Sequence, residues 1–170
     1  MAQRTDIFDV GRLGLSSGEG RTIGLEVPVD GFDFGGQRYD VEGGEVDARL
    51  DVSHTVRGYA FRLRFGAELD GPCVRCLEPA GHAVEVDARE IDQPGGGDEL
   101  SSPYFDEGHL DMRGWARDAL ALALPTQIVC SEDCAGLCAV CGANLNRSPE
   151  HAHEREPDPR WAALRELKLD

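Results

Sequence analysis

Three consecutive runs of alternating apolar and polar residues are the feature that most limits the folds open to this chain. The runs cover residues 46–53, 59–70 and 84–89, and short turn-rich stretches separate them. Successive side chains of a strand point to opposite faces, so each run predicts a strand with one apolar face. Because the connections between the runs are short, the pattern predicts an antiparallel meander. The apolar positions of the middle run are Tyr59, Phe61, Leu63, Phe65, Ala67 and Leu69.

The apolar face of such a sheet must be covered by another element. Asp111 is placed to cap a helix that contains Trp115 and Leu120, and Pro125 ends that helix. A further period-two pattern at residues 21–30 predicts an additional strand. We therefore predict an α+β fold, in which an antiparallel meander or a partly open barrel is covered by one helix.

Changes in composition divide the chain into three parts. The sheet and its covering helix are expected at residues 1–125, a cysteine-rich zinc-knuckle segment at 126–146, and a polar linker with a short C-terminal helix at 147–170. A helix this short is marginal alone, so we expect it to dock on a partner through its apolar stripe, with docking on its own domain as the alternative. That partner-binding stripe consists of Trp161, Leu164 and Leu167.

The six cysteines include two C-x-x-C pairs, Cys73 with Cys76 and Cys138 with Cys141, while Cys130 and Cys134 precede the second pair. Closely spaced cysteines in a reducing compartment are more often metal ligands or redox groups than structural disulfides. A C-x-x-C turn lets two thiolates converge on one tetrahedral ion. We therefore expect one zinc ion as the cofactor, with an iron-containing cluster as the alternative.

One tetrahedral ion takes four ligands, so six cysteines leave the choice of ligands open. The favoured set is the local quartet, because it closes the smallest loops and costs the least chain entropy. It consists of Cys130, Cys134, Cys138 and Cys141. The alternative quartet joins Cys73 and Cys76 to two of the later cysteines and would tether the hairpin to the segment after the helix. His151 and His153 could bind a metal, but they lie in a polar stretch, and we interpret them as solvated.

The chain is strongly acidic, with 32 acidic and 17 basic residues and a formal net charge of −15. This excludes a simple basic nucleic-acid binder and favours a basic partner. Arg49, Arg57, Arg62 and Arg64 could form a local basic patch, although a solvated face interleaved with acidic residues is the simpler interpretation. The sequence has no phosphate loop, nucleophile elbow or paired carboxylates, so we expect neither an enzyme nor a small-molecule substrate.

No run of residues reaches the roughly 18 apolar residues that a membrane span needs. The first residues, Met1–Asp9, lack the apolar stretch of a secretory signal. We therefore expect a cytoplasmic protein with no membrane partner.

Three ordered motifs resemble those of the YceD family, over roughly residues 70–165. They are C-V-R-C-L-E-P at residues 73–79, L-A-L-P and C-S-E-D-C-A-G-L-C-A-V-C-G-A-N-L-N within 122–146, and D-P-R-W-A-A-L at 158–164. The resemblance implies a cytoplasmic protein without established enzymatic activity that is needed for accumulation of large-subunit ribosomal RNA. It therefore implies a ribosome-assembly factor.

The charge suggests what such a factor would bind. An acidic protein is poorly suited to hold rRNA through its phosphates. We expect it to bind a basic large-subunit ribosomal protein or the pre-large-subunit particle, with any contact to rRNA being indirect. One alternative is a zinc-dependent protein that contacts precursor rRNA directly through the arginine patch and the zinc knuckle. The other is a C-x-x-C thiol oxidoreductase, which would place the pair at a helix start, where the dipole lowers a thiol pKa.

Overall fold

The structure is a computed structural model that describes residues 3–153. The described chain contains ten strands, three short 3-10 helices and the α-helix α1, Met112–Ala123. The 3-10 helices are η1 (Val10–Leu13), η2 (Glu42–Gly44) and η3 (Asp98–Leu100). The strands are β1 (Gln3–Arg4), β2 (Ile7–Asp9), β3 (Gly20–Pro28), β4 (Phe32–Phe34), β5 (Gln37–Val41), β6 (Glu45–His54), β7 (Tyr59–Pro72), β8 (Pro79–Asp92), β9 (Phe105–Asp106) and β10 (His109–Asp111).

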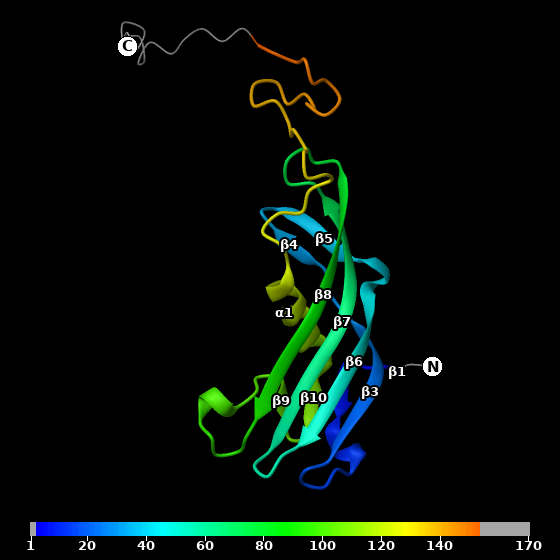
Figure 1. The fold of residues 1–170 in the computed structure, drawn as a ribbon, viewed down its shortest axis with the longest axis vertical. Helices are drawn as coiled ribbons and strands as arrows, with labels where there is room; N and C mark the ends of the chain where they lie inside the picture. The colour runs from blue at the N-terminus through cyan, green and yellow to red at the C-terminus, as the bar shows by residue number, and fades with distance from the viewer. Residues whose placement is uncertain (1–2, 154–170) are drawn as a thin grey trace, which may run out of the picture.

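The main sheet has seven strands, in the order β1-β3-β6-β7-β5-β4, and β8 pairs with the other edge of β7. The β7–β8 pairing is continuous from Tyr59↔Asp92 to Pro72↔Pro79. The opposite edge of β7 is shared, because β6 pairs with residues 59–64 and β5 with residues 69–70. The β7–β8 hairpin therefore extends well past β6, and its turn lies at the opposite end of the sheet from the β6–β7 turn (Figure 1).

The predicted covering helix is confirmed. Asp111 caps α1, and its Oδ1 accepts a hydrogen bond from the Gly114 amide at 2.9 Å. The buried face of α1 packs on the apolar face of the sheet, where Leu50 and Leu63 have no solvent exposure. The buried residues of α1 are Met112, Trp115, Ala116, Ala119 and Leu120. The α+β fold class is thus confirmed.

Two stretches outside the predicted alternating runs also contribute to strands. The glycine-rich stretch at 31–44 contains the β4–β5 hairpin, whose two turn residues Gly35 and Gly36 both have positive φ. This conformation suits a two-residue hairpin turn and favours glycine. The connection between the second and third runs is only residues 73–78, because the long strands stay paired up to Pro72 and Pro79.

A small second sheet, in the order β2-β10-β9, lies before the start of α1. None of the helices in residues 3–153 is long and apolar enough to cross a membrane. The expected C-terminal helix, with Trp161, Leu164 and Leu167, lies outside the described residues.

Candidate metal centre at the tip of the long hairpin

Four cysteines from two distant parts of the chain meet at the turn of the β7–β8 hairpin. Cys73 and Cys76 lie in the turn itself, between the ends of the two strands. After α1 the chain returns to this turn, where the Val74 amide donates a hydrogen bond to the Ile128 carbonyl at 3.0 Å. Cys130 and Cys134 follow directly, so the hairpin and the returning segment each supply two thiols.

The spacing of the sulfur atoms fits a tetrahedral ion. The Sγ atoms of Cys73 and Cys134 are 3.8 Å apart, and those of Cys76 and Cys130 are 3.5 Å apart. All four sulfur atoms lie within 4.8 Å of one another. A zinc–sulfur distance of about 2.3 Å implies sulfur atoms about 3.8 Å apart in a tetrahedron. All six cysteines are free thiols. The four thiols can therefore hold a metal ion, and thiolate ligands select a thiophilic metal.

The hairpin turn is shaped by a compact set of backbone hydrogen bonds. The Cys73 amide donates to the Glu78 carbonyl at 2.8 Å, and the Leu77 amide donates to the Cys73 carbonyl at 2.9 Å. The Arg75 amide points at Cys73 Sγ, at 3.4 Å. Leu77 has a φ of +61°, which is rare for a residue with a bulky side chain. Such a conformation persists only where the surroundings fix it, and here the hydrogen bonds of the turn do so.

Arg75 connects the two halves of the centre, and Asn146 supports Cys134 within the returning segment. The Arg75 guanidinium donates to the carbonyls of Glu132 at 3.1 Å and Cys134 at 3.3 Å. The Asn146 side-chain amide donates to Cys134 Sγ at 3.3 Å and accepts from the Ala135 amide at 2.7 Å. Groups of this kind orient ligands and stabilise thiolate charge. From the sequence, neither Arg75 nor Asn146 had a role beyond its place in the motifs at residues 73–79 and 122–146.

The four thiols do not ionise alike. Burial favours a higher pKa for Cys73, but the backbone amides of Cys130, Arg75 and Cys76 outweigh it and lower the pKa to about 6. The Glu78 amide acts to lower the pKa of Cys76, yet burial and the neighbouring thiols raise it to about 12. Adjacent thiolates repel one another, so some thiols in a cluster this compact resist ionisation. A divalent cation at the centre would remove that repulsion.

The structure divides the favoured local quartet between two clusters. Cys130 and Cys134 lie with the hairpin cysteines, whereas Cys138 and Cys141 lie with His151 and His153. The mixed quartet is therefore the one that the fold assembles, and the two histidines interpreted as solvated are beside thiols instead. Loop entropy did not anticipate this grouping, because the strands and Arg75 hold the distant segments together, and which quartet binds a metal stays a prediction.

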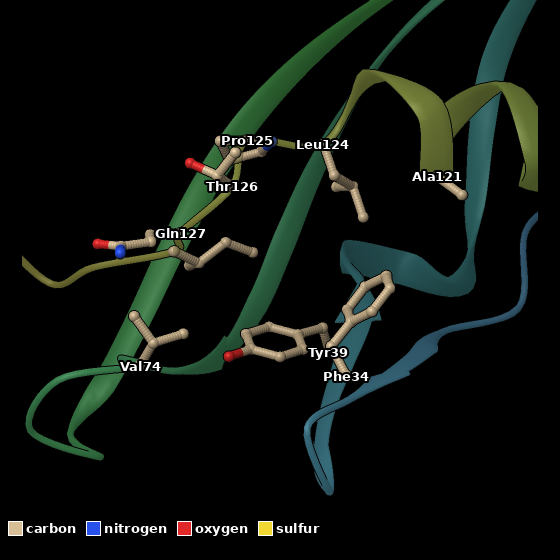
Figure 2. Close-up of a pocket in the computed structure, with 9 residues that line it drawn as sticks. Phe34, Tyr39, Val74, Ala121, Leu124, Pro125, Thr126 and Gln127 are labelled. Atoms are coloured by element: carbon tan, nitrogen blue, oxygen red, sulfur yellow. The ribbon is translucent and has the colours of Figure 1, made fainter.

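An apolar pocket lies beside the centre. Figure 2 shows the rings of Phe34 and Tyr39 on one side, Leu124 and the chain that follows it on the other, and Val74 at the hairpin end. Tyr39 is buried, and its hydroxyl donates to the Pro72 carbonyl at 2.9 Å. Val74 is one residue from a ligand candidate, so the pocket and the cysteine centre share a wall.

Two of the four arginines considered for a basic patch are paired with carboxylates on the outer face of the sheet. Arg62 makes two hydrogen bonds to Asp87, at 2.7 and 2.6 Å, and this pairing lowers the pKa of Asp87. Arg64 pairs with Asp51, which also accepts from Thr22 Oγ1 at 2.6 Å. This face therefore matches the interpretation as interleaved charges rather than a basic patch.

The sequence model described as "Large ribosomal RNA subunit accumulation protein YceD" matches residues 61–168. Uncharacterized proteins of Mycobacterium bovis and Mycobacterium tuberculosis are each 35% identical over 134 residues, which is 74% of this chain and 63% of theirs. An uncharacterized protein of Mycobacterium leprae is 34% identical over 101 residues, or 56% of this chain and 46% of its own. The chain thus spans less than two thirds of the length of these relatives. No solved structure matches the chain.

Proposed function

Because this chain belongs to the YceD family, we propose that it assists assembly of the large ribosomal subunit by binding a basic component, without catalysis. The family match over residues 61–168 carries the proposal, because the family is described by accumulation of large-subunit ribosomal RNA. The match includes both cysteine blocks of the candidate metal centre. The cytoplasm, where ribosomes assemble, is the proposed location.

The charge of the chain supports a protein rather than RNA as the direct partner. A net charge of −15 produces a field that repels phosphates and attracts basic surfaces. Two of the four arginines that could have offered a local exception, Arg62 and Arg64, are paired with Asp87 and Asp51. The proposed partner is therefore a basic large-subunit ribosomal protein, alone or within a precursor particle, and rRNA would be contacted indirectly.

Zinc is the proposed ion of the four-cysteine centre, held by Cys73, Cys76, Cys130 and Cys134. Four thiolates fill a tetrahedral zinc completely and leave no position for a reacting water, as in structural zinc sites. The ion would join the hairpin to the segment that returns from α1. Its role in the proposal is to fix the wall of the apolar pocket and the direction in which the chain continues toward residues 158–170.

The two alternatives have less support. Direct binding of rRNA would need unpaired basic groups, and the best candidates on the sheet face are in ion pairs. A thiol oxidoreductase needs an accessible attacking thiol, whereas Cys73 is 0% and Cys76 4% exposed. The Cys73–Cys76 pair also follows a strand, β7, rather than opening a helix.

The proposal is tested by purifying the tagged full chain from gently lysed cells, with and without RNase, and identifying the retained proteins by mass spectrometry. A basic large-subunit ribosomal protein that remains after RNase treatment is the expected result. Loss of every partner on RNase treatment would contradict the proposal and favour direct RNA binding.

A variant pair tests the predicted role of the C-terminal stripe. The triple substitution Trp161→Ala, Leu164→Ala and Leu167→Ala should abolish retention of that protein while leaving the melting temperature unchanged. Leu122→Ala is the matched control, because Leu122 is an 89% exposed apolar residue on α1. Equal retention by both variants would remove the stripe from the proposed interface.

A further inference from the structure

We propose that Cys138, Cys141, His151 and His153 bind a second zinc ion, independently of the four-cysteine centre. The structure groups these four residues as a separate cluster. The inference concerns a metal site of the chain itself and does not depend on the proposed ribosomal role.

The donor atoms of the second cluster converge on one point. Cys141 Sγ is 3.2 Å from His151 Nε2 and 3.2 Å from His153 Nε2, and the two Nε2 atoms are 2.9 Å apart. All four donor atoms, including Cys138 Sγ, lie within 4.8 Å of one another. A tetrahedral zinc with two sulfur and two nitrogen ligands implies separations of about 3.3 to 3.8 Å, so a small expansion would admit the ion.

The backbone around Cys138 and Cys141 repeats the hairpin turn of the first centre. The Cys138 amide donates to the Ala143 carbonyl at 2.8 Å, and the Gly142 amide donates to the Cys138 carbonyl at 2.8 Å. The Val140 amide points at Cys138 Sγ, at 3.4 Å. The residue after the second cysteine again has positive φ, +72° at Gly142. Two unrelated segments thus adopt one thiol-presenting turn, and each presents it to two further ligands.

This segment has no hydrophobic core that could order it. No residue from Leu137 to His153 is buried. Its described links to the rest of the chain are mainly polar: Asn144 and Arg147 contact the Glu78 carboxylate, and the Asn146 side chain contacts Cys134 Sγ and the Ala135 amide. A small segment that cannot bury apolar surface needs another source of stability, and a bound metal supplies it directly.

A catalytic thiol–imidazole pair is the competing interpretation of Cys141 and His151. Such a pair needs one base within hydrogen-bond reach of one thiol. The second imidazole and the second thiol have no role in that chemistry, yet both converge on the same point. All four side chains have a role only if they are ligands of one ion.

The test measures zinc per chain in the full-length protein purified under reducing conditions. Two ions are expected in the wild type and one in the His151→Ala/His153→Ala double variant. The His82→Ala/His109→Ala double variant is the matched control, since both histidines are exposed and belong to neither ligand cluster, and it should keep two ions. A wild-type content of one ion, or two ions in the His151→Ala/His153→Ala variant, would overturn the proposal.

Cobalt substitution and the reciprocal variant test the independence of the two sites. In the cobalt-substituted protein, the His151→Ala/His153→Ala variant should lose part of the absorption spectrum. The lost part should be that of a tetrahedral ion with two thiolate ligands. Cys73→Ser/Cys76→Ser should lose one ion and keep this spectrum. Loss of both ions in either double variant would mean that the sites are not independent, and retention of the full cobalt spectrum in both would mean that the second site does not exist.

Discussion

The sheet–helix body and the cysteine-rich tip bury very different side chains. In the body, residues 3–72 and 79–125, the buried side chains are mostly aliphatic and aromatic, with Leu50, Leu63 and Trp115 at the centre. In the tip, residues 73–78 and 126–153, the buried side chains are Cys73, Cys76, Cys134 and Ile128. Three of these four are candidate metal ligands. Apolar burial thus accounts for the body, whereas the proposed source of stability in the tip is metal ligation.

Removing the metal should produce the largest effect and should separate the two regions. The Cys73→Ser/Cys76→Ser variant removes two of the four ligands of the proposed zinc site in the tip. In small zinc domains, zinc binding stabilises folding by about 10 to 16 kcal/mol. Hydrogen exchange at the amides of residues 126–136 should therefore approach the rate of an unfolded chain, while amides of β6 and β7 stay protected. Ser131→Ala, at an exposed neighbouring position, is the control. Equal loss of protection in β6 would show that the body also depends on the metal.

A cavity in the body should destabilise the body and leave the metal content of the tip unchanged. Leu63→Ala removes a completely buried side chain of β7 and should lower the free energy of unfolding by about 2 to 5 kcal/mol. Denaturant unfolding followed by tryptophan fluorescence measures the change, because Trp115 lies in the same core. Zinc per folded chain should stay constant. Leu122→Ala, at an exposed position, should change stability by less than about 0.5 kcal/mol.

The junction between the regions can be disturbed with one methyl group. A Cβ at Gly71 would overlap the Tyr39 ring, which packs across β7 just before the hairpin turn. Gly71→Ala should therefore cost about 1 to 3 kcal/mol, through displacement of a buried aromatic side chain. Gly24→Ala in β3 is the matched control, since nothing lies within 4 Å of its Cβ position. The melting temperatures of the two variants measure this difference. An equal decrease in both would contradict the close packing at Gly71.

The smallest effect is expected at the same junction. Tyr39→Phe keeps the ring but removes the hydrogen bond to the Pro72 carbonyl. The free energy of unfolding should fall by about 0.5 to 1.5 kcal/mol, the usual net value of one hydrogen bond. Zinc content should not change. A loss as large as that of Leu63→Ala would mean that the hydroxyl organises the tip as well as the junction.

Local patterns in the sequence were sufficient to predict much of the structure of the body. Alternation in β6, β7 and β8 predicted their apolar faces, and the capping residue Asp111 predicted where α1 begins. These features depend on neighbours two to four residues apart, so the sequence alone determines them. The same holds for the C-x-x-C pairs, whose two thiols must lie close together wherever the chain carries them.

The combination of ligands was decided by the tertiary structure. Cys73 and Cys134 are 61 positions apart, and they meet because the β7–β8 pairing continues to Pro72 and the chain returns from α1 to the hairpin turn. Arg62 and Arg64 likewise lose their freedom to act as a basic patch through cross-strand pairing with Asp87 and Asp51. Loop-closure entropy grows only slowly with loop length, so separation in sequence is a weak guide to which ligands meet. A rigid hairpin that places two thiols beside a returning segment therefore outweighs the shorter loops of the local quartet.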